Sequence, residues 1–235
     1  MYLLDNKKFL VALSFFIMYI PLCHSQVSVD TLSLDYGQYN VGFRHFLAID
    51  STRTYKRTMD FTKGSMLREI PVSIWYPAKI EANIGRPMVV MDYMEILKEE
   101  EEWEHLPNEF ILNWFYYPNT KDNQEHLKEG VKALLNANSI EGSFPTIIYA
   151  PSYQASSIEN FALSEFLASH GFIVIASPGR GAENRFFNGG TAKDMEAQAR
   201  DIEFLIKVSL NLKGVDQNAI ATMGFSFGGL SNVLS

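Results

Sequence analysis

Ser226 lies in Gly224-Phe225-Ser226-Phe227-Gly228, directly after the apolar run 219–223. A strand that runs into a G-x-S-x-G turn presents its serine as a nucleophile, because the chain reverses tightly from strand to helix. Side chains two residues to either side would collide with neighbouring backbone, so Gly224 and Gly228 are expected to leave room. The pattern therefore predicts acyl transfer through Ser226.

Acyl transfer also needs hydrogen-bond donors for the oxyanion, each contributing about 2.7–4 kcal/mol of transition-state stabilisation. One donor is expected to be the backbone N–H of Phe227, and the other to come from the loop after the apolar strand 146–150. Pro151 has no N–H, so Tyr153 is the first choice in that loop and Gln154 the next. The alternative is that Ser152 and Tyr153 only shape the loop.

Near-continuous apolar runs alternate with helical patterns from residue 144 onward. We expect buried strands at 146–150, 172–176 and 219–223, which indicates a parallel sheet covered on both faces. A Ser156/Glu159 capping box is expected to open the first helix and Gly171 to end it, and Thr191 with Asp194 to cap the second. Upstream, alternation in 41–49 and 70–76 predicts an antiparallel pair of strands.

Residues 79–142 differ from both flanking parts and predict an insertion between the second and third strands. They combine an acidic run, 99–104, with a dense group of aromatic residues, and we expect two or three helices, one from about Lys121 to Leu135. Two interpretations stay open. The insertion could be a lid over an apolar substrate pocket, or an extra packed subdomain whose glutamates form a solvated helix face.

Three segments, 70–78, 167–174 and the turn around Ser226, resemble the platelet-activating-factor acetylhydrolase family, close to dienelactone-hydrolase-like α/β-hydrolases. The resemblance runs from about Val41 to the end of the chain, apart from 79–142. It implies an α/β-hydrolase fold and a metal-free serine esterase acting on short acyl esters of phospholipids or related substrates. By position it implies Ser226 as nucleophile and Tyr153 and Phe227 as oxyanion donors.

Two positions depart from that family's pattern. Its oxyanion loop typically reads His-Gly-x-Gly, where this chain has Pro151-Ser152-Tyr153-Gln154, and its turn usually has a histidine where this chain has Phe225. In this fold the acid and the histidine follow the serine along the chain, yet neither residue type occurs after Ser226. We therefore expect the catalytic acid and histidine to be absent from this chain, and the fold to be incomplete at its C-terminus. The alternatives are a peptidase on the same fold, and a non-catalytic binding protein or inert fragment.

The chain has 235 residues, of which 47% are hydrophobic, and a net charge of −7. This suits one hydrolase domain over 26–235 and excludes the basic footprint of a nucleic-acid-binding protein. We expect a small-molecule ester or lipid substrate, with peripheral contact to a membrane surface in the lipid case. No His, Cys or carboxylate cluster has the spacing of metal ligands, so no metal or organic cofactor is expected.

The N-terminus has the features of a signal peptide over residues 1–25. Lys7 and Lys8 precede an uncharged stretch, 9–22, and small residues suit cleavage after Ser25. The alternative is an uncleaved anchor, although the stretch is short for a membrane span. Cleavage predicts an exported protein, periplasmic or extracellular, that has lost its only cysteine, Cys23.

Overall fold

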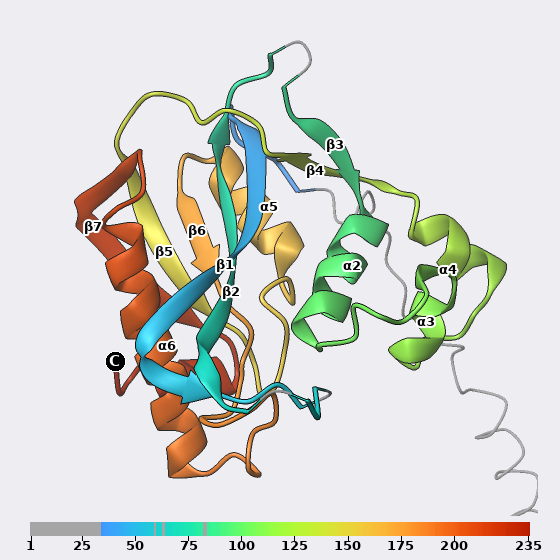
Figure 1. The fold of residues 1–235 in the computed structure, drawn as a ribbon. Helices are drawn as coiled ribbons and strands as arrows, with labels where there is room; N and C mark the ends of the chain where they lie inside the picture. The colour runs from blue at the N-terminus through green and yellow to red at the C-terminus, as the bar shows by residue number, and fades with distance from the viewer. Residues whose placement is uncertain (1–33, 59, 63, 82–83) are drawn as a thin grey trace, which may run out of the picture. The chain divides into compact units, whose positions relative to one another are not determined.

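The computed structural model describes residues 34–235 apart from 59, 63 and 82–83, so the predicted signal peptide lies outside the described residues. The predicted antiparallel pair is present as β1 (Asn40–Tyr55) and β2 (Met66–Ala78). The predicted parallel strands are β5 (Phe144–Ala150), β6 (Ile173–Ala176) and β7 (Val215–Gly224). The expected burial of 219–223 is wrong, because β7 is the last strand of the sheet, pairs only with β5 and has no buried residue. The described strands form one sheet in the order β3-β4-β1-β2-β6-β5-β7, in which β5 lies between its two parallel neighbours (Figure 1).

Helices cover the two faces of this sheet, as the apolar runs predict. Neighbouring residues of β2 point to opposite faces: Trp75 packs in a core cluster with α5 (Phe161–Ser169), whereas Ile74 packs in a cluster with α6 (Ala192–Ser209). The helix α5 connects β5 to β6, and α6 then leads back past β5 to β7 (Figure 1). The direction of winding therefore reverses at β5, and such a point leaves a crevice at the carboxyl ends of the strands.

The predicted helix ends are confirmed at two of three places. At the start of α6, the Asp194 carboxylate accepts hydrogen bonds from the Thr191 N–H (2.9 Å) and hydroxyl (3.1 Å). Gly171 has φ +93° and follows α5, as predicted. The Ser156/Glu159 capping box is wrong, because α5 begins only at Phe161 and the Ser156 hydroxyl instead donates to Glu100, far away in sequence.

The insertion over 79–142 contains helices, as predicted, but also two strands. After β3 (Arg86–Val89) come α2 (Val90–Glu100), a 3-10 turn at Asn108–Phe110, α3 (Ile111–Trp114), α4 (Lys121–His126) and β4 (Gly130–Leu135). The predicted helix from Lys121 to Leu135 is therefore wrong in its second half. There, β4 pairs in parallel with β1 through residues 41–43, and β3 pairs with β4. These pairings extend the main sheet, so the insertion is anchored to it at both ends.

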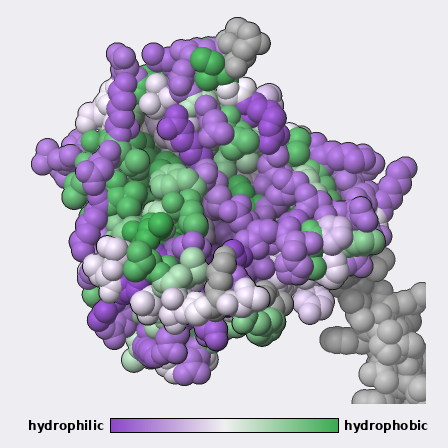
Figure 2. Space-filling view, viewed as in Figure 1, coloured by the Kyte–Doolittle hydropathy of each residue, from purple (hydrophilic) through white to green (hydrophobic). Residues whose placement is uncertain are grey.

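The surface of the insertion is largely hydrophilic. Figure 2 shows that hydrophobic residues gather on the side of this face where β5 and α6 lie, whereas the side of α2, α3 and α4 is mostly polar. Beneath that polar surface the insertion has an apolar cluster of its own, formed by Val90, Ile111, Leu112 and Leu127. The interpretation of the acidic run as a solvated helix face, one of the two left open, is wrong at two positions, since Glu100 and Glu102 are buried.

A buried carboxyl group links α5 to the insertion. Glu165 accepts hydrogen bonds from the Tyr93 hydroxyl (2.9 Å) and from the backbone N–H groups of Lys132 (3.2 Å) and Ala133 (3.1 Å). Burial raises the pKa of Glu165 from an ordinary 4.5 to about 7, although these hydrogen bonds oppose the change. A raised carboxyl pKa means that the folded protein binds a proton that the unfolded chain has already released.

The stability that comes from this proton should be present below about pH 4.5 and lost as the pH rises through about 7. We expect the free energy of unfolding to fall by up to about 3 kcal/mol across this window. Urea unfolding of wild type and Glu165→Gln at several pH values checks this prediction. Glutamine has no titrating proton, so the free energy of unfolding of Glu165→Gln should depend less on pH between about 4.5 and 7. Equal slopes in the two proteins would contradict the assignment.

Candidate active site

Ser226 lies in the turn between the end of β7 and the short helix α7 (Phe227–Ser231). Its backbone has φ +53° and ψ −115°, a region that residues with a side chain rarely adopt. The Ser226 side chain is exposed. The predicted serine is therefore held in a strained turn that presents it to solvent at the carboxyl end of the sheet.

The glycines on either side of Ser226 occupy positions without room for a side chain. A Cβ on Gly224 would lie 2.4 Å from the carbonyl carbon and oxygen of Gly228. A Cβ on Gly228 would lie 2.2 Å from the carbonyl oxygen of Ala150. Both contacts involve backbone atoms, which cannot rotate away, so the tight turn requires glycine at these two places.

Parallel pairing brings the loop after β5 next to this turn. Ala150 is the register partner of Gly224, and the Phe225 N–H donates to the Ala150 carbonyl oxygen over 3.1 Å. Since the carboxyl ends of both strands lie at the same end of the sheet, the loop that begins at Pro151 lies beside Ser226. The structure therefore places the two predicted oxyanion segments side by side.

Three aromatic rings fix the contact between the two segments. The rings of Tyr153 and Phe227 meet edge-to-face with centroids 5.5 Å apart, and Phe187 packs against both, at 5.2 and 5.1 Å. Within the part of the chain that the structure describes, neither the Tyr153 nor the Phe227 backbone N–H has a hydrogen-bond partner. Two unpaired N–H groups beside an exposed serine are what an oxyanion site requires.

Comparison with known proteins gives the fold but no close relative. No protein-family model and no curated protein sequence matches the chain. Among solved structures, it is similar to a ferulic acid esterase from Streptomyces cinnamoneus, with a TM-score of 0.57, 19% sequence identity and coverage of 86% of this chain. The chain has the α/β-hydrolase fold.

The match covers 56% of the ferulic acid esterase, so this chain spans little more than half of that protein's length. A weaker likeness is to brefeldin A esterase, a bacterial homologue of human hormone sensitive lipase. It has a TM-score of 0.43 and 12% identity, and the match covers 98% of this chain and 44% of that one.

The described histidines have partners other than Ser226 or are exposed. His45 Nδ1 is 2.9 Å from the Ser73 hydroxyl, and burial lowers its pKa. His126 pairs with Glu129 at 3.1 Å, and His170 Nδ1 is 2.8 Å from the Phe166 carbonyl oxygen at the end of α5. His105 is exposed within the insertion. No described histidine hydrogen-bonds to Ser226.

Sequence reasoning missed two polar residues that support the site. Gln198 of α6 is buried, donates to the Pro151 carbonyl oxygen (3.0 Å) and accepts from the Ser231 hydroxyl (2.7 Å), so it connects the loop after β5 to α7. Glu159 accepts from the Ser152 N–H at 2.9 Å within the same loop. An amide on the apolar face of a helix was a usable signal for Gln198, because buried polar groups need partners.

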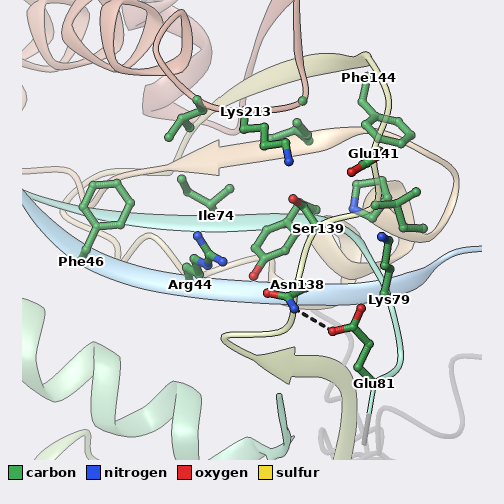
Figure 3. A pocket seen from close by; sticks show the side chains of 16 residues that line it. Arg44, Phe46, Ile74, Lys79, Glu81, Asn138, Ser139, Glu141, Phe144 and Lys213 are labelled. Carbon is green, nitrogen blue, oxygen red and sulfur yellow. Dashed lines mark hydrogen bonds between the residues drawn. The ribbon is translucent and has the colours of Figure 1, made fainter. Parts of the chain in front are cut away.

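A cavity of about 490 Å³ lies at the opposite end of the sheet from Ser226. Its lining includes Phe144, Ile173 and Gly214, at or just before the amino ends of β5, β6 and β7. Figure 3 shows Arg44, Lys79 and Lys213 around its apolar floor, and Asn138 bonded to Glu81. This cavity is therefore separate from the turn that carries Ser226, which lies at the carboxyl ends of the parallel strands.

Two further properties concern the described residues alone. No group of three or more His, Cys, Asp or Glu side chains in the described part of the chain is placed to hold a metal ion. No helix there is long and apolar enough to span a membrane.

Proposed function

We propose that this protein is a serine hydrolase that cleaves carboxylic esters through an acyl-enzyme on Ser226. The observation that carries the proposal is the strained Ser226 turn lying next to two unpaired backbone N–H groups, on Phe227 and Tyr153. The similarity of the fold to an esterase adds support. By resemblance, we propose short acyl esters, including those of phospholipids, as the substrate class.

In the first step, the Ser226 oxygen attacks the ester carbonyl carbon, and its proton passes to a general base. The carbonyl oxygen becomes an oxyanion that accepts hydrogen bonds from the Phe227 and Tyr153 N–H groups. The carbon–oxygen bond to the alcohol then breaks, and the alcohol takes the proton from the base. Water hydrolyses the acyl-enzyme by the same route. The order of triads in this fold leads us to propose that the general base is a histidine that follows the serine along the chain and is oriented by an acid.

A fluorophosphonate probe tests this function, because it reacts with activated serines. We expect the protein encoded by the complete reading frame to be labelled, and mass spectrometry of the digest to locate the adduct on the peptide containing Ser226. Preincubation with a short acyl ester should slow labelling. An adduct on another serine, or no adduct in a folded protein, would contradict the proposal.

A further inference from the structure

Three successive glutamates at the end of α2 contact three different parts of the main domain. Glu100 accepts hydrogen bonds from Ser156 and Ser157 in the loop after β5. Glu101 pairs with Arg185 in the loop after β6. Glu102 accepts from the Tyr55 hydroxyl and the Thr58 N–H, both at 2.6 Å. These glutamates therefore attach the insertion to the rest of the domain, and Glu100 and Glu102 are almost fully buried.

Arg185 joins this attachment to the segment that follows Tyr153. Its side chain is 2% exposed, and Nη2 donates both to Glu101 and to the Gln154 carbonyl oxygen, the latter over 3.2 Å. Its Nη1 donates to the Gly179 carbonyl oxygen, also at 3.2 Å. A planar guanidinium can hold several acceptors at fixed angles, whereas an ammonium group cannot.

The segment that follows Tyr153 makes further hydrogen bonds to the loop after β6, which contains both Gly179 and Arg185. Gln154 has φ +56°, and its side-chain oxygen accepts from the Phe187 N–H at 3.2 Å. The Gly179 N–H donates to the Ala155 carbonyl oxygen at 2.8 Å. The peptide that carries the Tyr153 N–H is tied to the same turn, because its Ser152 carbonyl oxygen accepts from the Ala155 N–H at 3.2 Å. The Gln154 carbonyl oxygen that Arg185 holds belongs to the same peptide as that Ala155 N–H, so Arg185 acts on the direction of the Tyr153 N–H through this turn.

Glu100 fixes the far end of the same loop through a buried chain of hydroxyl groups. The Ser157 hydroxyl donates to Glu100 (2.5 Å), so its oxygen must accept from Ser73 (2.7 Å), and Ser73 must accept from His45 Nδ1 (2.9 Å). Each hydroxyl has one proton, so this order assigns the proton of His45 to Nδ1. Burial raises the pKa of Glu100, while the bonds from Ser156 and Ser157 oppose the rise.

We propose that Arg185, held by Glu101, is a positioning residue that fixes the loop after β5 so that the Tyr153 N–H points at the reacting carbonyl oxygen. The inference rests on the proposed function of Ser226 and extends it to the insertion. It makes the acidic end of α2 part of the support of the site. Arg185 does not touch the reacting atoms and acts on the Tyr153 N–H through Gln154. Since an oxyanion donor acts mainly in the transition state, loss of Arg185 should lower kcat.

Arg185→Lys in the protein encoded by the complete reading frame tests the proposal. Lysine keeps the charge beside Glu101 but loses the planar fork, so we expect a folded protein. Its kcat for 4-nitrophenyl acetate should fall by about 10- to 100-fold, within the effect of losing one oxyanion donor. We expect KM to change by less than about twofold, because the donor acts mainly in the transition state. Glu101→Gln should also lower kcat, because it removes the charge that holds Arg185.

Arg57→Lys is the matched control, because Arg57 forms an ion pair with Glu104 from the same acidic run (2.5 Å) but, among the described residues, makes no hydrogen bond or ion pair to the loop after β5. Its kcat should equal that of wild type. Wild-type kcat in Arg185→Lys, or losses of kcat that only follow losses of melting temperature, would overturn the positioning role.

Hydrogen exchange separates this inference from the proposed function. In Arg185→Lys the N–H groups of Gly179 and Phe187, which bond to Ala155 and Gln154, should exchange faster than in wild type and in Arg57→Lys. The Ser157 N–H, bonded to Glu100 at 3.0 Å, should keep its protection. Unchanged exchange at Gly179 and Phe187 overturns the inference even if Ser226 proves to be the nucleophile. A wild-type protein without Ser226-dependent activity overturns the proposed function, and the catalytic role of Arg185 with it.

Discussion

Ser226→Ala should lower kcat for 4-nitrophenyl acetate by at least about 10⁴-fold in the protein encoded by the complete reading frame, since removing a catalytic serine removes the covalent route. Ser235→Ala, which replaces another exposed serine of the same C-terminal segment, should leave kcat unchanged. Activity retained in Ser226→Ala would exclude this residue as the nucleophile.

Ser226→Gly should be equally inactive but more stable than Ser226→Ala, by about 1 kcal/mol. The reason is the backbone at φ +53°, which glycine adopts without strain and alanine does not. Urea unfolding of the two inactive proteins measures this difference without interference from activity. Equal stabilities would show that the turn is not strained.

Gly228→Ala has the largest expected effect on stability. Its Cβ would lie 2.2 Å from the Ala150 carbonyl oxygen, so β5 and α7 would have to move apart. We expect a loss of about 3 kcal/mol or more in the free energy of unfolding, together with loss of activity because the Phe227 N–H moves with α7.

Gly229→Ala is the matched control for Gly228→Ala. The nearest atom to a Cβ at this position is the Gly224 carbonyl oxygen at 3.7 Å, an ordinary contact. Alanine also favours a helix more than glycine does, so Gly229→Ala should be neutral or stabilising by up to about 1 kcal/mol. Equal losses in the two variants would contradict the close approach of Gly228 to β5.

The parallel strands and the serine turn were predictable because their signals are local. β5, β6 and the second half of β7 contain short apolar runs, and Gly224 and Gly228 mark a turn by their spacing alone. The proximity of Tyr153 to Phe227 also follows from sequence, once the strands that precede them are expected to be parallel neighbours.

The errors occurred where a residue's partner is far away in sequence. The run 130–135 continues a helical pattern, yet it forms β4 because the edge of β1 at 41–43 is available to pair. Ser156 fits a capping box, but Glu100 accepts its hydroxyl proton. The acidic run fits a solvated helix face, but Glu100 and Glu102 have partners in other elements, and no local pattern reveals such partners.

The pairing of β5 with β7 has a consequence for how the protein acquires its reactivity. Tyr153 follows β5 and Ser226 follows β7, and these two strands are separated along the chain by α5, β6 and α6, all of which are synthesised before β7. Non-local parallel pairing forms late, because a long loop must close first. Reactivity toward a serine probe should therefore appear in a refolding reaction together with the docking of β7, later than the helical signal. The appearance of this reactivity would thus measure the completion of folding.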